Sequence, residues 1–227
     1  MHAPLEATEI IAHRGYSALA PENTVAAFQS AWAAGTDACE LDLHLTVDQQ
    51  IVVIHDKDTK RTTGVDRVVA ESTLAELKAL DAGAWKSPKF AGERIPTLAE
   101  ALATLPPGAR QFVLEVKCGP EVVPILGKEL DAWKDRREQL CIIAFDRTVA
   151  REAKRAIPWL KVYRLSSEKT RLKIPVDLEA LIRDTVADGL DGLSLSHKWN
   201  WTEAMVAQVR DAGLEIYVWT INDPADA

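Results

Sequence analysis

Short apolar runs alternate with amphipathic segments along most of the chain. Apolar runs that predict strands occupy residues 10–13, 38–43, 111–116, 140–144, 160–164, 192–195 and 215–220. Segments with a helical period of apolar residues follow most of these runs, at residues 24–34, 121–133, 147–156, 178–187 and 202–212. This repeated order of strand and helix predicts parallel βα units, and therefore an α/β fold.

Polar residues recur at or near the C-terminal ends of the predicted strands. They are His13, Arg14, Glu40, Asp42, Glu115, Lys117 and Trp219. A TIM barrel gathers its active-site residues at this end of its strands, so we predict a TIM (β/α)8-type barrel. A doubly wound sheet is the alternative, because it produces the same alternation of elements.

Residues 57–95 interrupt the alternation. They follow an apolar run at residues 51–55, contain several glycines and a proline, and show one helical pattern, at residues 73–80. This is too long for an ordinary βα connection, and we expect a small insertion after the second strand, a lid segment within a single barrel domain spanning residues 1–227. Too few residues follow position 220 for another βα unit, so we expect the final unit to be missing from the printed sequence.

Composition narrows the possible partners and compartments. The chain has 227 residues and a formal net charge of −7, which argues against nucleic acid as a partner. No apolar run approaches the roughly 18 residues of a membrane span, and residues 1–9 do not resemble a leader, so we expect a cytoplasmic protein without stable membrane association. Cys39, Cys118 and Cys141 fit reduced thiols better than a disulfide framework.

The carboxylates indicate a cation site. Glu40 and Asp42 are two positions apart in a strand and therefore share one face, and Glu115 and Lys117 repeat this spacing. Carboxylates that meet in a barrel mouth repel one another unless they bind a cation or share protons. Oxygen ligands suit one hard divalent ion, Mg²⁺ or Ca²⁺. The alternative is an ion-pair network with Arg14 and Lys117.

Two histidines are candidates for proton transfer. His13 closes a predicted strand and is followed by Arg14, which can contact a phosphate, and by Gly15, which permits a tight turn. His55 closes the run at residues 51–54. The imidazole pKa of about 6.5 suits both acceptance and donation of a proton near neutral pH. His44 is expected to face away from the carboxylates.

An ordered set of motifs resembles the glycerophosphodiester phosphodiesterase family. In chain order the motifs are His13-Arg14-Gly15, Pro21-Glu22-Asn23-Thr24, Glu40-Leu41-Asp42, His55-Asp56, Arg61-Thr62-Thr63-Gly64, Ile95-Pro96-Thr97-Leu98, Glu115-Val116-Lys117 and Trp219-Thr220-Ile221-Asn222. A lone His-Arg-Gly would be weak evidence, but an ordered set across nearly the whole chain is specific.

The resemblance implies a fold, a reaction and a set of roles. The fold is a TIM barrel with an insertion after the second strand, and the reaction is metal-dependent hydrolysis of a glycerophosphodiester to glycerol 3-phosphate and an alcohol. The implied roles are general acid and base for His13 and His55, metal ligands for Glu40, Asp42 and Glu115, phosphate contacts for Arg14 and Lys117, and substrate pocket for Trp219. Which histidine is the acid, and whether attack is by water or by the substrate's own hydroxyl through a cyclic phosphate, stays open.

Two other functions are the alternatives. A lysophospholipase D-like enzyme of the same fold would need an apolar groove, for which residues 57–95 offer only Trp85, Phe90 and scattered leucines. A non-catalytic phosphodiester-binding barrel would have no need for two histidines together with a complete set of metal ligands. Small water-soluble diesters are therefore the expected substrates.

Overall fold

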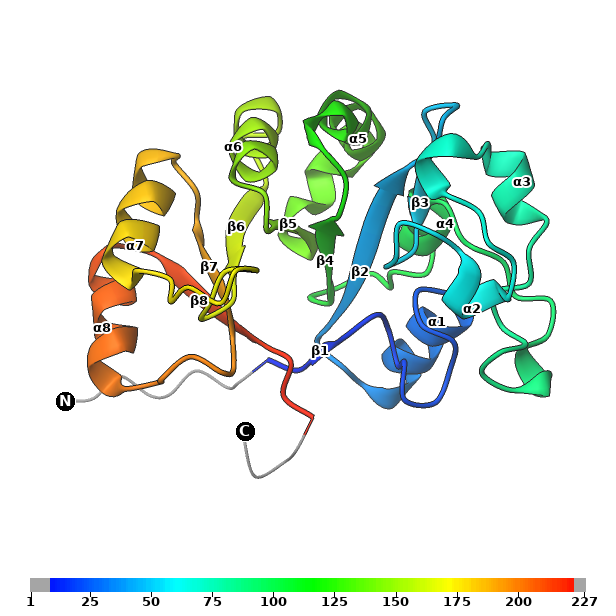
Figure 1. Ribbon diagram of the computed structural model, residues 1–227, viewed down its shortest axis with the longest axis horizontal. Helices are drawn as coiled ribbons and strands as arrows, with labels where there is room; N and C mark the ends of the chain where they lie inside the picture. Colours follow the sequence, from blue (N-terminus) through cyan, green and yellow to red (C-terminus); the bar gives the residue numbers. More distant parts are fainter. Residues whose placement is uncertain (1–8, 223–227) are drawn as a thin grey trace. The chain divides into compact units, whose positions relative to one another are not determined.

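The computed structural model describes residues 9–222. They form two compact α/β units, with Val113 the last residue of unit 1 and Leu114 the first of unit 2 (Figure 1). The predictions of a missing final βα unit and of no leader concern the two ends of the sequence, where residues 1–8 and 223–227 lie outside the described residues. The prediction of one domain stays a prediction.

Unit 1 begins with two parallel strands joined by a helix. β1 (Ile11–Ala12) pairs with β2 (Ala38–Leu45), and α1 (Val25–Ala34) lies between them in the chain. The Thr24 side chain caps α1 by accepting a hydrogen bond from the amide of Ala27. Phe28 of α1 packs edge-on against Phe112, with ring centroids 5.2 Å apart, and both side chains are fully buried. An aromatic core thus holds α1 against the sheet.

β3 (Ile51–Val53) reverses the direction of the chain. It pairs antiparallel with β2, so that Val53 lies opposite Leu43 and Ile51 opposite Leu45. The amide of Ile54 then donates to the Asp42 carbonyl at 3.0 Å. The residues after β3 therefore run back along β2 toward its carboxylates.

Residues 57–95 are ordered and have a small core of their own. Their elements are α2 (Lys60–Thr63), η1 (Val69–Glu71), α3 (Leu74–Lys78) and the 3-10 helix η2 (Pro88–Phe90). The predicted helix at residues 73–80 corresponds to α3, which Thr73 and Glu76 start with a capping box. Val69, Leu77 and Ile95 pack on Val52 and Ile54 at the base of the segment. α4 (Leu98–Leu102) follows.

Unit 2 contains a run of parallel βα units. β4 (Gln111–Val116) crosses from unit 1 into unit 2. The elements that follow are η3 (Pro120–Val122), α5 (Val123–Leu130), η4 (Asp131–Gln139), β5 (Leu140–Ala144), α6 (Arg147–Ala156), β6 (Lys161–Ser166), α7 (Leu178–Ala187), β7 (Gly192–Ser196), α8 (Glu203–Asp211) and β8 (Glu215–Trp219). β5 to β8 pair in sequence order, all parallel, and α6, α7 and α8 pack on them (Figure 1).

Glycine at position 192 lets a tyrosine lie across β7. The Tyr163 ring on β6 reaches Tyr217 on β8, with centroids 4.8 Å apart, and its hydroxyl donates to Glu215 at 2.6 Å. A Cβ atom on Gly192 would lie 2.7 Å from the Tyr163 ring and 2.3 Å from the Glu215 carbonyl oxygen, so a side chain does not fit there. The two tyrosine rings thus meet over β7 at the one position of that strand where the missing side chain leaves room.

Candidate active site

A left-handed turn after β1 positions His13 and Arg14. Arg14 and Gly15 both have positive φ angles, 58° and 71°. A Cβ atom on Gly15 would lie 2.7 Å from the Ala27 carbonyl carbon, so the close approach of the turn to α1 requires glycine. The Arg14 amide donates to Glu40 Oε2 at 2.9 Å. The turn thereby connects the predicted His-Arg-Gly motif to the carboxylates of β2.

Glu40 and Asp42 lie buried on one face of β2. Their relative exposures are 6% and 0%, and carboxylate oxygens of the two lie within 4.8 Å of each other. Asn23 holds Asp42 from the side, because its amide nitrogen donates to Asp42 Oδ2 at 2.7 Å. Arg14 Nε lies 3.4 Å from the same oxygen. The period-two prediction for this strand is confirmed in unit 1.

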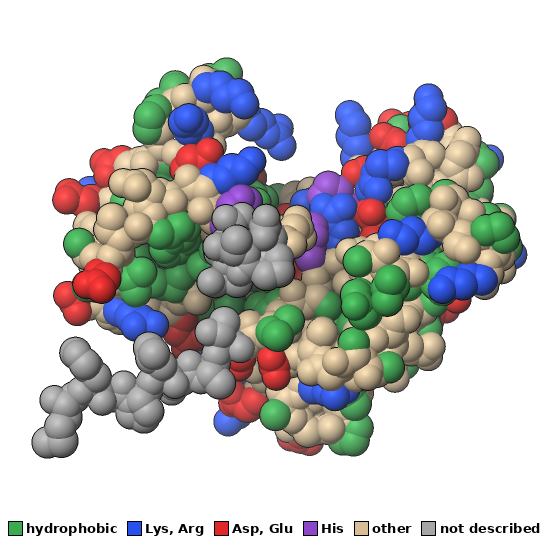
Figure 2. Space-filling model, turned by 90° about the horizontal axis from the view of Figure 1, so that it is seen from below, with side chains coloured by type: hydrophobic (Ala, Val, Ile, Leu, Met, Phe, Trp, Pro, Cys, Tyr) green, Lys and Arg blue, Asp and Glu red, His purple; other side chains and the backbone are tan. Residues whose placement is uncertain are grey.

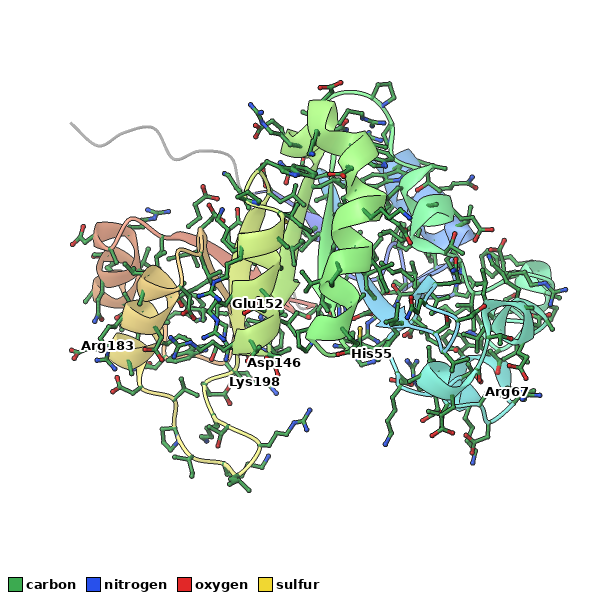
Figure 3. All side chains as sticks on the ribbon, turned by 90° about the horizontal axis from the view of Figure 1, so that it is seen from above. His55, Arg67, Asp146, Glu152, Arg183 and Lys198 are labelled. Carbon is green, nitrogen blue, oxygen red and sulfur yellow. The ribbon has the colours of Figure 1, made fainter. Side chains whose placement is uncertain are left out.

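A chain of charged groups runs from His55 to Arg14. His55 Nδ1 lies 2.7 Å from Asp56 Oδ1, and Arg61 Nε donates to Asp56 Oδ2 at 2.6 Å. Arg61 also donates twice to Glu22, at 2.8 Å each, and Arg14 Nη1 donates to Glu22 at 3.0 Å. Because a carboxylate accepts, His55 carries its proton on Nδ1, which leaves Nε2 for exchange with a substrate. Figure 2 shows histidine side chains beside basic ones on this unit, at the right, and Figure 3 labels His55.

Burial and neighbouring charges set the protonation states. Burial, followed by the positive charge of Arg14, lowers the pKa of His13 to about 4, so this imidazole is neutral at pH 7. Burial alone would raise the pKa of Glu22, but hydrogen bonds and charge from Arg61 and Arg14 outweigh it and lower that pKa. The same balance, with Arg61 and His55 as partners, lowers the pKa of Asp56. Both carboxylates are therefore ionised at neutral pH.

The donor set of β2 fits a hard divalent cation. Two buried carboxylates with oxygens a few ångströms apart supply the oxygen ligands that Mg²⁺ and Ca²⁺ prefer. The ion pair expected under the alternative interpretation is also formed, between Arg14 and Asp42. The two interpretations are compatible, because a carboxylate has two oxygens. It can pair with an arginine through one oxygen and bind a metal ion through the other.

Unit 2 carries the other predicted site residues. Glu115 is buried on β4, and Lys117 Nζ donates to Glu115 Oε1 at 2.7 Å, which agrees with their predicted common face. Trp219 ends β8, packs edge-on against Phe145 with centroids 5.6 Å apart, and donates from its indole nitrogen to the Ser194 carbonyl. Its polar atom is therefore occupied, and a ring surface is what it can offer to a ligand.

Sequence reasoning missed part of the site in unit 1. Glu22, Asn23, Asp56 and Arg61 appear in the motifs above, but no role was assigned to them. The signal for Asn23 was a polar residue in a turn, since asparagine tolerates the left-handed conformation it adopts, with φ 57°. The expectation for His44 was wrong: it has the same parity as Glu40 and Asp42 on β2, and its Nε2 donates to the carbonyl of His55 at 3.2 Å.

Comparison with known proteins identifies relatives along nearly the whole chain. Residues 13–227 match the model of the glycerophosphoryl diester phosphodiesterase family. A glycerophosphodiester phosphodiesterase of Caldanaerobacter subterraneus subsp. tengcongensis is 43% identical over 160 residues, which cover 68% of this chain. The match covers 65% of that relative's length, just under two thirds.

Solved structures confirm the predicted fold class. A phosphodiesterase of Oleispira antarctica, solved with the product sn-glycerol-3-phosphate, is 29% identical with a TM-score of 0.81, over 96% of this chain and 87% of that one. A glycerophosphodiester phosphodiesterase of Thermotoga maritima is 28% identical with a TM-score of 0.78, over 97% and 89%. The chain thus has an α/β fold of the TIM-barrel type.

Proposed function

The chain belongs to the glycerophosphoryl diester phosphodiesterase family, and we propose that it hydrolyses glycerophosphodiesters, such as glycerophosphocholine or glycerophosphoethanolamine, to glycerol 3-phosphate and an alcohol. The observation that carries this proposal is the arrangement in unit 1. There, Arg14 lies in the turn beside His13 and contacts both carboxylates of β2. A series of salt bridges connects Arg14 with His55. The glycerol 3-phosphate bound to the Oleispira antarctica relative supports the choice of product.

Arg14 is the proposed phosphate ligand in unit 1. Its guanidinium has several N–H donors, of which Nη1 donates to Glu22, while Nε lies 3.4 Å from Asp42 Oδ2 as an ion pair, and its side chain is only 18% exposed. Positioned in this way, the group can donate to a phosphoryl oxygen without first losing side-chain entropy. Lys117, which the family resemblance gives the same role, is the proposed second contact.

Glu40, Asp42 and Glu115 are the proposed ligands of one Mg²⁺ or Ca²⁺ ion. The geometry of the β2 pair supports the first two, and the family motif supports the third. A bound divalent cation would neutralise charge that develops on the phosphoryl oxygens. The buried state of Glu40 and Asp42 favours this role, since an unneutralised pair of buried carboxylates would be costly.

His13 is the proposed base and His55 the proposed acid. A neutral His13 at pH 7 can accept a proton from the attacking hydroxyl, which belongs either to water or to the substrate's glycerol. His55 Nε2 would give a proton to the departing alkoxide, while Asp56 stabilises the imidazolium through Nδ1. A cyclic phosphate among early products would identify attack by the substrate's hydroxyl.

Product release tests the proposal. Glycerophosphocholine and metal ion are mixed with the wild-type chain, and glycerol 3-phosphate and choline are measured. We expect turnover that a chelator removes and that added Mg²⁺ or Ca²⁺ restores, and we expect none from His13→Asn or His55→Asn. Turnover by either variant at the wild-type rate would refute the roles of the histidines, and full activity in excess chelator would refute the metal.

The same assay separates the alternatives. Faster release of choline from lysophosphatidylcholine than from glycerophosphocholine would identify a lysophospholipase D-like enzyme. Binding of glycerophosphocholine without release of either product would identify a non-catalytic barrel. The assignment of Trp219 to the substrate pocket, the small-molecule partner and the cytoplasmic location stay predictions. No helix among residues 9–222 is long and apolar enough to cross a bilayer.

A further inference from the structure

We propose that the loop between β6 and α7 docks the protein reversibly on the surface of an anionic lipid bilayer. This loop, residues 168–176, is called the basic hairpin here. It extends from unit 2 as the yellow loop at the bottom of Figure 3 and as the protrusion at the upper left of Figure 2. The proposal goes beyond the phosphodiesterase activity and does not depend on it.

Hydrogen bonds fix the conformation of the basic hairpin. The Val176 amide donates to the Glu168 carbonyl at 3.0 Å, and Lys169 and Pro175 form an antiparallel bridge. At the tip the Ile174 carbonyl accepts from the Thr170 amide at 2.8 Å. The side chains at the tip are therefore presented by a defined turn.

Two aliphatic side chains stand exposed at that tip. Leu172 is 81% exposed, the largest value among the large hydrophobic residues that the structure describes, and Ile174 is 57% exposed. Both lie on a convex protrusion, where two side chains offer far less than the roughly 1,000 Å² that a specific protein interface buries. A bilayer has no such requirement, because lipid head groups part around a small apolar tip.

Three cations surround the aliphatic pair. Lys169, Arg171 and Lys173 alternate with other residues along the hairpin, and none of them forms an ion pair with any residue of the described part of the chain. The chain as a whole has a net charge of −7, so this local positive group runs against the overall charge. Positive side chains beside exposed aliphatic ones complement an anionic membrane surface, where each cation contributes to affinity.

The position of the basic hairpin within unit 2 predicts which edge of this unit would face the bilayer. The hairpin follows the C-terminal end of β6, and the parallel strands β7 and β8 end at the same edge. Trp219, proposed for the substrate pocket, lies at the end of β8. At the base of the hairpin the Trp199 indole nitrogen donates to the Ser166 carbonyl at 3.3 Å. Docking would therefore turn this edge of unit 2 toward the lipid.

Vesicle sedimentation with the full chain tests the proposal. The probes are vesicles of phosphatidylcholine alone and of phosphatidylcholine mixed with phosphatidylglycerol, without substrate. We expect binding to the mixed vesicles that added salt weakens. Lys169→Gln/Arg171→Gln/Lys173→Gln should lower the partition coefficient roughly 100-fold, at about fivefold per cation. Leu172→Ser/Ile174→Ser should lower it about tenfold.

Matched variants elsewhere in unit 2 are the controls. Val186→Ser removes an aliphatic side chain that is 49% exposed on α7, and Lys134→Gln/Arg137→Gln/Arg155→Gln removes three exposed cations. Both should bind like the wild type, and every hairpin variant should keep its melting temperature and any hydrolysis of glycerophosphocholine.

Three results would overturn the proposal. The first is no binding of the wild type to the mixed vesicles, and the second is equal binding by the wild type and the hairpin variants. The third is a self-associated wild type that fails to bind vesicles and becomes monomeric in Leu172→Ser/Ile174→Ser, which would assign the tip to a second copy of the chain. If the chain had no phosphodiesterase activity, the measurements of vesicle binding and self-association would be unaffected, so the two proposals fail independently.

Discussion

Replacing Asp56 with asparagine should move the proton of His55 from Nδ1 to Nε2. The two oxygens of Asp56 face two donors, His55 Nδ1 at 2.7 Å and Arg61 Nε at 2.6 Å. Asparagine has one acceptor and one donor at these positions, and the charged Arg61 takes the acceptor. The amide N–H₂ then faces His55, which can accept it only with Nδ1 unprotonated. Nε2 then holds the single proton of a neutral imidazole, which is a very weak acid, and no carboxylate stabilises the imidazolium that is proposed to protonate the alkoxide.

The expected loss of rate follows from the exposure of the pair. Removing the carboxylate that orients a buried catalytic histidine costs about 10⁴ in kcat in serine hydrolases. The side chains of His55 and Asp56 are 29% and 30% exposed, so water can replace part of the interaction. We expect kcat to fall about 10- to 100-fold, equivalent to roughly 1.4 to 2.7 kcal/mol of transition-state stabilisation.

Two measurements check this prediction. Steady-state hydrolysis of glycerophosphocholine gives kcat, and ¹H–¹⁵N correlation spectra of the imidazole rings give the tautomer. Asp66→Asn is the matched control, because Asp66 lies in the same segment, is 62% exposed and pairs only with Lys60 at 3.3 Å in the described residues. A loss of rate with an unchanged His55 tautomer, or a changed tautomer with an unchanged rate, would refute the reasoning.

Three further predictions concern stability. His13 binds a proton near pH 6.5 in the unfolded chain but only at about pH 4 in the folded chain. The free energy of unfolding should therefore fall by about 1 to 2 kcal/mol between pH 7 and pH 5. Urea titrations at the two pH values should show a loss smaller by this amount in His13→Asn. Gly192→Ala should lower the free energy of unfolding by about 2 to 4 kcal/mol, because its methyl group overlaps the Tyr163 ring and the Glu215 carbonyl, and an unchanged urea midpoint would contradict that account. Saturating Mg²⁺ or Ca²⁺ should raise the melting temperature of the wild type and not of Glu40→Gln, with an increase that grows with the logarithm of metal concentration; equal increases in both proteins would remove Glu40 from the proposed ligands.

Local patterns in the sequence predicted the regular elements well. Residues 147–156 were predicted as a helix and form α6, because Asp146 caps its first turn and Val149, Ala150 and Ala153 form one buried face. The carboxylates of β2 were placed on one face because side chains alternate in any strand. Both inferences depend on neighbours a few residues apart, which a single sequence contains.

Contacts between distant residues were beyond this reasoning. The run at residues 51–54 gives no indication of direction, and only its pairing with β2 shows that β3 is antiparallel and returns His55 toward Asp42. Arg61 and Glu22 are 39 positions apart, and their hydrogen bonds require the insertion to fold back on the turn after β1. No periodicity encodes such a pair, so a role for Arg61 could not be assigned before the structure.

The small core formed by residues 57–95 and β3 has a consequence for how the proposed activity would be lost on heating. Arg61 comes from this segment, which Val69, Leu77 and Ile95 hold against β3, while its two carboxylate partners lie outside it or at its edge. A subglobal opening of the segment would release both Glu22 and Asp56 and leave the parallel strands of unit 2 intact. Heat inactivation would then begin below the calorimetric transition and reverse on cooling, as expected if the least stable cooperative part of the protein also orders the proposed catalytic groups.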